Sequence, residues 1–111
     1  ARGAGTTVRI DWAKVPLLPG VRELAGAGLV TGASGRNWAA YGHEVQMGAA
    51  LQAPDQALLS DPQTSGGLLV SCSADAVPEV LATFQRHGFA QAAEIGEIVP
   101  AMAGGIRLTV G

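Results

Sequence analysis

The chain has 111 residues, of which 48% are hydrophobic and 14% are charged, and its formal net charge is -2. This length and composition predict one folded domain with a hydrophobic core of its own. The weak charge gives no sign of a basic surface for nucleic acid or anionic lipid, so we expect neither partner. No apolar run approaches the roughly 20 residues of a membrane span, and the start lacks the apolar centre of a signal peptide. A cytoplasmic location is the expectation.

The first half of the sequence predicts one strand, one helix and a long loop. Thr6–Ile10 alternates and is rich in β-branched residues, which is typical of a half-buried strand. Residues 17–28 predict a short helix with Pro19 in its opening turn and a glycine at its end. Residues 31–53 mix glycine, polar and aromatic residues without a period. They predict a long loop with at most a short helical piece, and such loops are usually functional or poorly ordered.

The next part of the chain predicts two helices separated by a strand. Residues 53–61, "APDQALLSD", suggest one or two helical turns. Residues 67–72, "GLLVSC", are continuously apolar up to the serine, which favours a strand buried on both faces. Residues 74–88 have apolar side chains at helical spacing after a good N-cap, Ser73, so they give the clearest helix prediction of the chain.

Two further strands complete the predicted fold. They span residues 92–100 and 105–111, and we expect the second at an edge or terminus of the sheet. The order of elements predicts an α/β (α+β) layered sandwich, in which helices pack on a mixed β-sheet.

The stretch "DPQTSGGLLV" holds an unusual density of functional groups ahead of its apolar run. Gly66 and Gly67 permit close backbone approach or a positive φ, while Thr64 and Ser65 supply hydroxyl donors. Consecutive backbone N–H groups in such a turn can bind an anion. Asp61 precedes a proline, however, and an Asp there commonly starts a turn through its own side chain. A ligand loop and a structural turn both stay open.

The stretch "TGASGRNWAAYGH" is the second candidate. Arg36 can bind a carboxylate or phosphate in a fork, Asn37 can donate and accept, and Ser34 adds a hydroxyl, which together suit an anionic substrate. The alternative is that Arg36 pairs with a nearby carbonyl or acid while Trp38 and Tyr41 anchor the loop to the core. The residues alone leave both readings open.

The remaining reactive residue types favour structural roles. His43 has no partner fixed by spacing, and His87 lies in the last turn of a helix, where a cation suits the dipole. Cys72 is the only cysteine and is expected to fill space in its strand. Catalytic motifs such as GxSxG and HExxH are absent, and the aspartates are scattered, so no metal site is expected.

Two motifs in a fixed order carry a family resemblance. Residues 61–70, "DPQTSGGLLV", follow residues 32–43, "GASGRNWAAYGH", and together they resemble the C-terminal domain of the selenide, water dikinase (selenophosphate synthetase) family. This family belongs to the aminoimidazole ribonucleotide synthetase superfamily. Residues 15–30 and 94–100 are similar to it too. The resemblance implies that residues 1–111 are a single C-terminal domain, shortened at its N-terminus and separated from an ATP-binding N-terminal domain.

The resemblance also implies an activity for the complete protein. Members of the family convert ATP, selenide and water into selenophosphate, AMP and orthophosphate, with Mg²⁺ and ATP held mainly by the N-terminal domain and its dimer partner. The present chain would form one wall of the interdomain cleft, with no catalytic residue, metal ligand or cofactor of its own, and would be inactive alone. Its implied partners are the N-terminal domain, a second copy in a homodimer, ATP and selenide. The residues expected at the phosphate region are Ser34, Arg36, Asn37, Asp61, Thr64, Ser65, Gly66 and Gly67.

The chain departs from the family in one loop. Where the family usually has a proline, two glycines, a threonine, a variable residue and Arg-Asn, residues 31–37 read Thr-Gly-Ala-Ser-Gly-Arg-Asn. Ser34 keeps the hydroxyl, whereas Ala33 gives up the freedom of glycine. The alternatives are another superfamily member, such as a thiamine-phosphate kinase or a hydrogenase maturation factor, and a non-catalytic interaction module.

Overall fold

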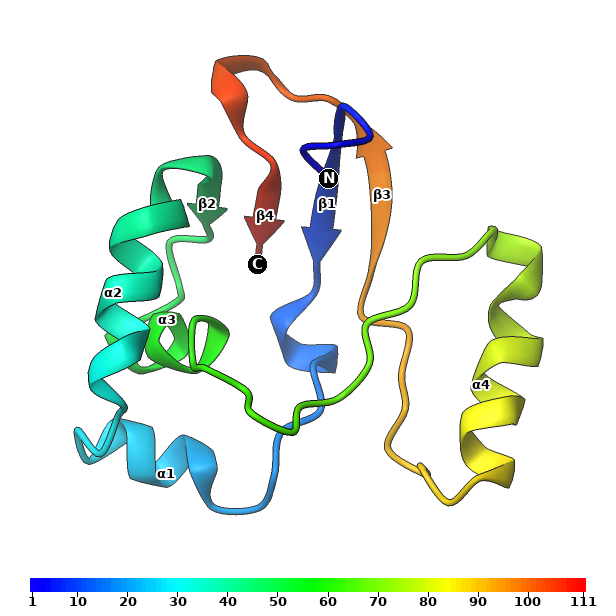
Figure 1. Cartoon of the computed structure of the whole chain (residues 1–111), viewed down its shortest axis with the longest axis horizontal. Coiled ribbons are helices and arrows are strands. Elements are labelled where there is room, and N and C mark those ends of the chain that lie inside the picture. The colour runs from blue at the N-terminus through cyan, green and yellow to red at the C-terminus, as the bar shows by residue number, and fades with distance from the viewer.

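The centre of the molecule is a four-stranded sheet in the order β2-β4-β1-β3 (Figure 1). The computed structural model describes all residues from Ala1 to Gly111. The strands are β1 (Thr6–Ile10), β2 (Val45–Met47), β3 (Gly96–Pro100) and β4 (Leu108–Val110). β1 pairs antiparallel with β3 and parallel with β4, and β4 pairs parallel with β2. The mixed sheet predicted from the sequence is therefore confirmed.

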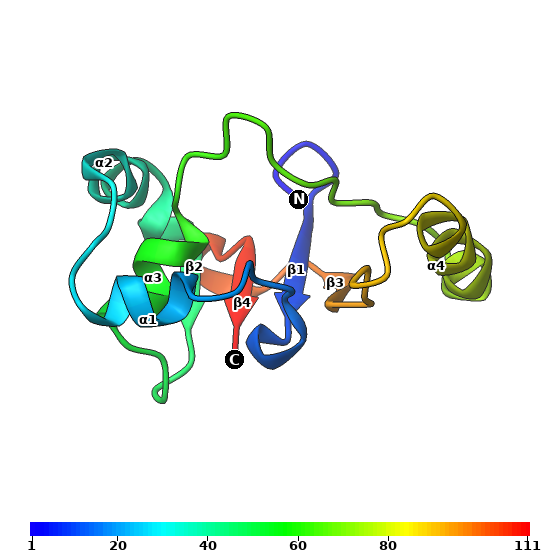
Figure 2. The same cartoon turned by 90° about the horizontal axis from the view of Figure 1, so that it is seen from below.

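Helices lie at both ends of this row of strands. They are α1 (Val21–Gly26), α2 (Gly32–Tyr41), α3 (Ala53–Leu59) and α4 (Val77–Arg86). α3 packs against both α1 and α2, and this group lies at the β2 end of the sheet, whereas α4 stands beyond β3 (Figures 1 and 2). Four short 3₁₀ turns complete the chain: η1 (Trp12–Lys14), η2 (Gly42–Glu44), η3 (Ala74–Ala76) and η4 (Ala103–Gly105).

Local sequence signals explain three of the four helices. Gly20 caps α1 in the left-handed region with a φ of 82°, which few residues other than glycine adopt. Pro54 stands in the first turn of α3, where its missing N–H costs nothing. Gly88, with a φ of 89°, follows α4 and ends it as predicted.

The core is thinner than the hydrophobic content predicts. Five residues are buried, and Thr7 is the most completely buried of them: Thr7, Trp12, Ala25, Ser34 and Val110. Thr7 is polar but satisfied, because its hydroxyl donates to the carbonyl of Ile106 at 2.8 Å and accepts from the N–H of Met102 at 3.0 Å. Burial therefore concentrates where β1 meets the loop before β4 and where η1, α1 and α2 lie.

The prediction of a long loop over residues 31–53 is wrong. This stretch contains the ten-residue helix α2, the turn η2 and the strand β2. Its glycines hide the helical pattern, but the side chain of Thr31 caps the N-terminus and packing against α3 supplies the stability that propensity lacks.

The prediction of a buried strand at residues 67–72 is also wrong. The segment forms no strand, and Leu68 and Leu69 are 81% and 76% exposed. An apolar run becomes a strand only where an adjacent strand offers free backbone groups, and this run pairs with none. Cys72 is correspondingly exposed rather than a buried space filler.

The last strand lies inside the sheet and not at its edge. β4 runs between β2 and β1, with Leu108 opposite both Val45 and Val8. Because β2 was not predicted, the sequence offered no strand that could cover the outer side of β4. The edges of the sheet are β2 and β3.

Candidate functional site

The two motifs that the sequence singled out meet at the N-terminus of α2. Thr31 is the N-cap of this helix, and Ser34 and Asn37 follow at spacings of three residues, so the three side chains share one helix face. That face contacts the end of α3, where Ser60 and Asp61 lead into the second motif. Segments separated by about two dozen residues are thus joined by side-chain hydrogen bonds.

The hydroxyl of Thr31 is the centre of the first contact. It donates to Oδ1 of Asp61 at 3.1 Å, and it accepts from the backbone N–H of Ser34 at 3.3 Å. A hydroxyl carries one proton, so the 3.0 Å contact between Oγ of Ser34 and Oγ1 of Thr31 has serine as its donor. Oδ2 of Asp61 accepts from Nε2 of Gln63 at 3.0 Å. Both carboxylate oxygens of Asp61 are therefore engaged.

Asn37 makes the second contact, with Ser60, the residue directly before Asp61. Its side-chain Nδ2 donates to the carbonyl oxygen of Ser60 at 2.9 Å. The hydroxyl of Ser60 donates in turn to the carbonyl of Gln56 at 2.7 Å, which also accepts from the backbone N–H of Ser60 at 3.1 Å at the end of α3. The Nδ2 group of Asn37 is thus used within the fold, while the residue also lines an open hollow.

Two open hollows border Asp61. One, of about 400 Å³, is lined by Asn37, Trp38, Tyr41, Gly42, Val45, Leu59, Ser60, Asp61 and Leu108. The other, of about 410 Å³, lies between α1, the start of α2 and α3 and is lined by Val21, Leu24, Ala25, Leu29, Val30, Thr31, Ser34, Ala57, Leu58 and Asp61. Apolar side chains with a few polar groups are the usual lining of a small-molecule site. Asp61 lines both hollows.

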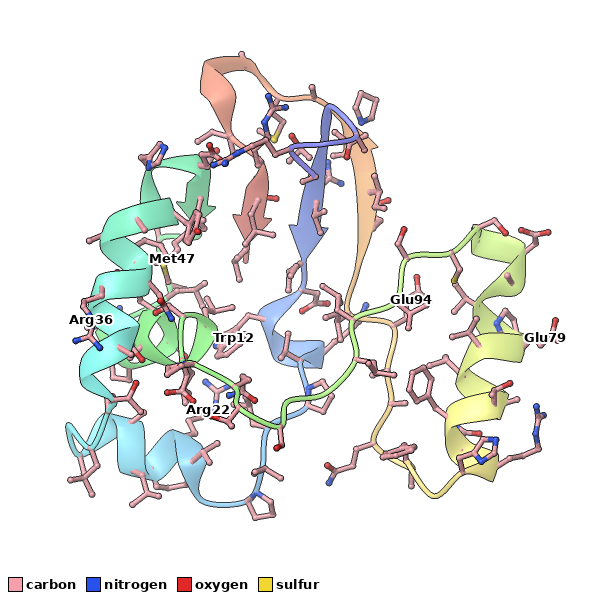
Figure 3. The ribbon with its side chains drawn as sticks, in the orientation of Figure 1. Trp12, Arg22, Arg36, Met47, Glu79 and Glu94 are labelled. Carbon is pink, nitrogen blue, oxygen red and sulfur yellow. The ribbon has the colours of Figure 1, made fainter.

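Arg36 lies apart from this contact. Its side chain extends from the outer side of α2 (Figure 3), and it forms no hydrogen bond and no ion pair within the chain. Neither the carbonyl nor the acid that the alternative reading required is present at its guanidinium. The fork of donors on Arg36 is therefore available to an anion from outside the chain.

The residues Thr64–Gly67 lie in the exposed part of the second motif. Thr64 and Ser65 make a turn, and all four residues are exposed. Gly66 and Gly67 do not adopt the positive φ that the sequence allowed. Gly66 instead permits close packing, because a Cβ there would lie 2.6 Å from the Cβ of Gln63. Their hydroxyl and backbone groups remain accessible to a ligand.

A second polar cluster, which was not predicted, surrounds Asp55 (Figure 3 labels Trp12 and Arg22). Its carboxylate accepts from the backbone N–H of Gln52 at 2.9 Å, from Nε1 of Trp12 at 2.7 Å and from Nη1 of Arg22 at 2.9 Å. These bonds, led by that of Gln52, hold the pKa of Asp55 below its ordinary value. An acid three residues into a helix is the signal that could have revealed this role.

Sequence reasoning also did not select Thr31, Ser60 and Gln63 as site residues. A threonine directly before a helix is a recognised capping signal, but the helix itself was not predicted. Partners such as the Ser60 carbonyl leave no trace in the sequence, because any residue supplies a backbone oxygen.

The histidines lie outside the contact between the two motifs. His43 is exposed, with Nε2 3.7 Å from Oε1 of Glu44. A hydrogen bond from Arg2 at 2.6 Å lowers the pKa of Glu44 below its ordinary value. His87 is the C-cap of α4 and lies directly after its last residue, Arg86, one residue beyond the last turn in which the sequence placed it.

No three His, Cys, Asp or Glu side chains gather where one metal ion could be held.

The helices of the chain are too short or too polar to cross a lipid bilayer.

Fold and sequence together define the class of protein. Residues 1–108 match the family described as AIR synthase related protein, C-terminal domain, and the chain belongs to this family. Its mixed sheet with helices is consistent with such a domain.

The curated relatives that the chain resembles share one enzyme name, selenide, water dikinase. The chain is 58% identical to the selenide, water dikinase of Burkholderia pseudomallei (strain K96243) over 103 residues, which are 93% of this chain and 29% of the relative. It is 58% identical to that of Pseudomonas straminea over 98 residues, 88% of this chain and 28% of the relative. The relative from Escherichia coli O9:H4 (strain HS) is 46% identical over 103 residues, 93% of this chain and 28% of the relative. The chain thus spans under a third of the length of these relatives.

Proposed function

We propose that this chain is the C-terminal domain of a selenide, water dikinase. The observation that carries the proposal is the 58% identity to an enzyme of that name across 93% of the chain. The proposed reaction of the complete protein is the conversion of ATP, selenide and water into selenophosphate, AMP and phosphate, in the cytoplasm. ATP and Mg²⁺ would be bound by the N-terminal domain in a homodimer, and no step of the reaction is assigned to a metal held by this chain.

In this proposal the chain forms one wall of the interdomain cleft. Three features support it: the exposed donors of Thr64–Gly67, the unpaired guanidinium of Arg36, and the position of Asp61 between two hollows. Exposed hydroxyl, backbone N–H and guanidinium groups are the donors that phosphate oxygens accept. Ser34 and Asn37 support the wall from within, because the hydroxyl of Ser34 and the Nδ2 group of Asn37 form hydrogen bonds inside the fold.

The test replaces the exposed donors in the longest chain that the gene encodes. We expect Thr64→Ala and Arg36→Ala to lower kcat/KM for selenide-dependent AMP formation about tenfold or more, since each removes a donor to charged phosphate. Unfolding should be unchanged, because both side chains are free of internal partners. Thr83→Ala is the control, since its hydroxyl bonds only within α4, to Glu79 and Arg86. Unchanged kinetics for both variants would contradict the assignment of these donors.

A further inference from the structure

We infer that Thr31 and Asn37 are positioning residues that clamp the "DPQTSGG" segment onto α2. The inference rests on the proposed function for its catalytic consequence, but the clamp itself is a property of this chain. It is visible in two hydrogen bonds to successive residues: Thr31 to the side chain of Asp61 and Asn37 to the carbonyl of Ser60.

The clamp acts where the chain passes from the end of α3 into a loop that no side-chain hydrogen bond holds. α3 ends at Leu59, and Pro62 lacks the N–H with which a helix would continue. Beyond Gln63 the next side-chain hydrogen bond lies within α4, between Thr83 and Glu79. The direction in which the exposed loop leaves α3 is therefore fixed at Ser60 and Asp61.

The geometry of α2 makes the clamp rigid. Thr31 is held by Ser34, which is 3% exposed and donates to it through both its N–H and its hydroxyl. Asn37 stands two turns into the helix, so the two contact points are spaced along a fixed rod. Two points of attachment define an orientation, whereas one would leave the segment free to swing.

Asp61 has a role that differs from direct phosphate binding. A carboxylate repels an anionic ligand, and its two oxygens already accept from Thr31 and Gln63. Asp61 therefore receives the clamp, and the exposed residues after it are the ones left to contact a ligand. This division explains why the motif combines an acid with hydroxyl and glycine residues.

The experiment compares Thr31→Val with Thr31→Ser in the longest chain that the gene encodes. Valine removes the hydroxyl at nearly constant shape, and serine restores it. We expect Thr31→Val, which removes the bond to Asp61 together with the N-cap bond from the Ser34 N–H, to speed hydrogen exchange of the Ser60 and Asp61 amides about tenfold or more. Thr31→Ser should exchange like the wild type, and so should the control Thr83→Val on α4. Asn37→Asp, which removes the donor to Ser60, supplies a second variant if the valine variant does not fold.

Activity provides the second readout and separates the two proposals. With the clamp lost, kcat for selenide-dependent AMP formation should fall about tenfold while KM for ATP changes little, because the loop is misplaced rather than removed. If Thr31→Val exchanges faster than the wild type, but the wild type shows no selenide-dependent activity, the clamp is retained and the proposed function is rejected. Unchanged exchange in both Thr31→Val and Asn37→Asp, or equal effects of valine and serine, would overturn the clamp.

Discussion

Asp55 is a single side chain that ties three segments together. It joins η1 through Trp12, α1 through Arg22 and the start of α3 through Gln52, and the guanidinium of Arg22 lies 5.2 Å from the centre of the Trp12 ring. In a molecule with five buried residues, such a junction replaces part of the missing core. We expect it to govern stability more than any exposed ion pair of the chain.

Its lowered pKa gives this junction a defined pH dependence. The Asp55 carboxyl has a pKa of about 4 in the unfolded chain and a lower pKa in the folded chain. The stabilisation that its hydrogen bonds give is therefore complete above about pH 5. It is lost as the pH falls through the folded pKa. Asp55→Asn should lower the free energy of unfolding by about 1–2 kcal/mol at pH 7, and the difference should shrink towards pH 2. Urea unfolding followed by tryptophan fluorescence measures this, and a difference that is constant with pH would contradict it.

At the scale of elements, the pairing of β1 with β3 depends on one glycine, Gly96. Gly96 pairs with Ile10, and a Cβ at this position would overlap the carbonyl oxygen of Arg9. The next pair is Arg9 with Glu97, whose side chains form an exposed ion pair at 2.7 Å. The glycine therefore lets the two backbones approach at the start of β3.

Gly96→Ala should weaken this pairing. We expect a loss of about 1–3 kcal/mol in the free energy of unfolding, the usual cost of forcing atoms into occupied space. Gly35→Ala in α2 is the matched control, because a Cβ there meets nothing and alanine favours the helix by about 0.5–1 kcal/mol. Thermal unfolding of both variants checks the opposite signs. A stability of Gly96→Ala equal to that of the wild type would show that the strands do not approach as described.

Elements with strong local signals could be predicted from the sequence, and those that depend on distant partners could not. β1 was predicted with its observed bounds, and α4 was clear from its apolar spacing and closing glycine. α2 was missed because its glycines hide the period, and its stability comes from α3. Residues 67–72 show the reverse error, since their apolar run lacks a strand partner.

The same distinction holds for the candidate site. Both motifs were found from their residue types, and the resemblance placed them in one cleft. That Asn37 is used inside the fold, and that Thr31 and Asp61 bond to one another, depends on the packing of α2 on α3. Packing between segments so far apart in sequence is not encoded in any local pattern.

For the whole molecule, the exposed apolar surface is the main structural finding. Leu68, Leu69, Phe89 and Ile98 are all more than half exposed, and α4 has few contacts beyond the turn that precedes it. The chain also spans under a third of its curated relatives. Both facts agree with the proposal that it works as one domain of a larger enzyme.

The measurement that tests this account most directly is AMP formation from ATP with and without selenide, using the longest chain that the gene encodes and residues 1–111 alone. The account predicts selenide-dependent AMP from the long chain and none from the short one. ATP turnover that is independent of selenide would contradict it and favour another activity of the superfamily. An absence of turnover in the long chain would favour a non-catalytic interaction module.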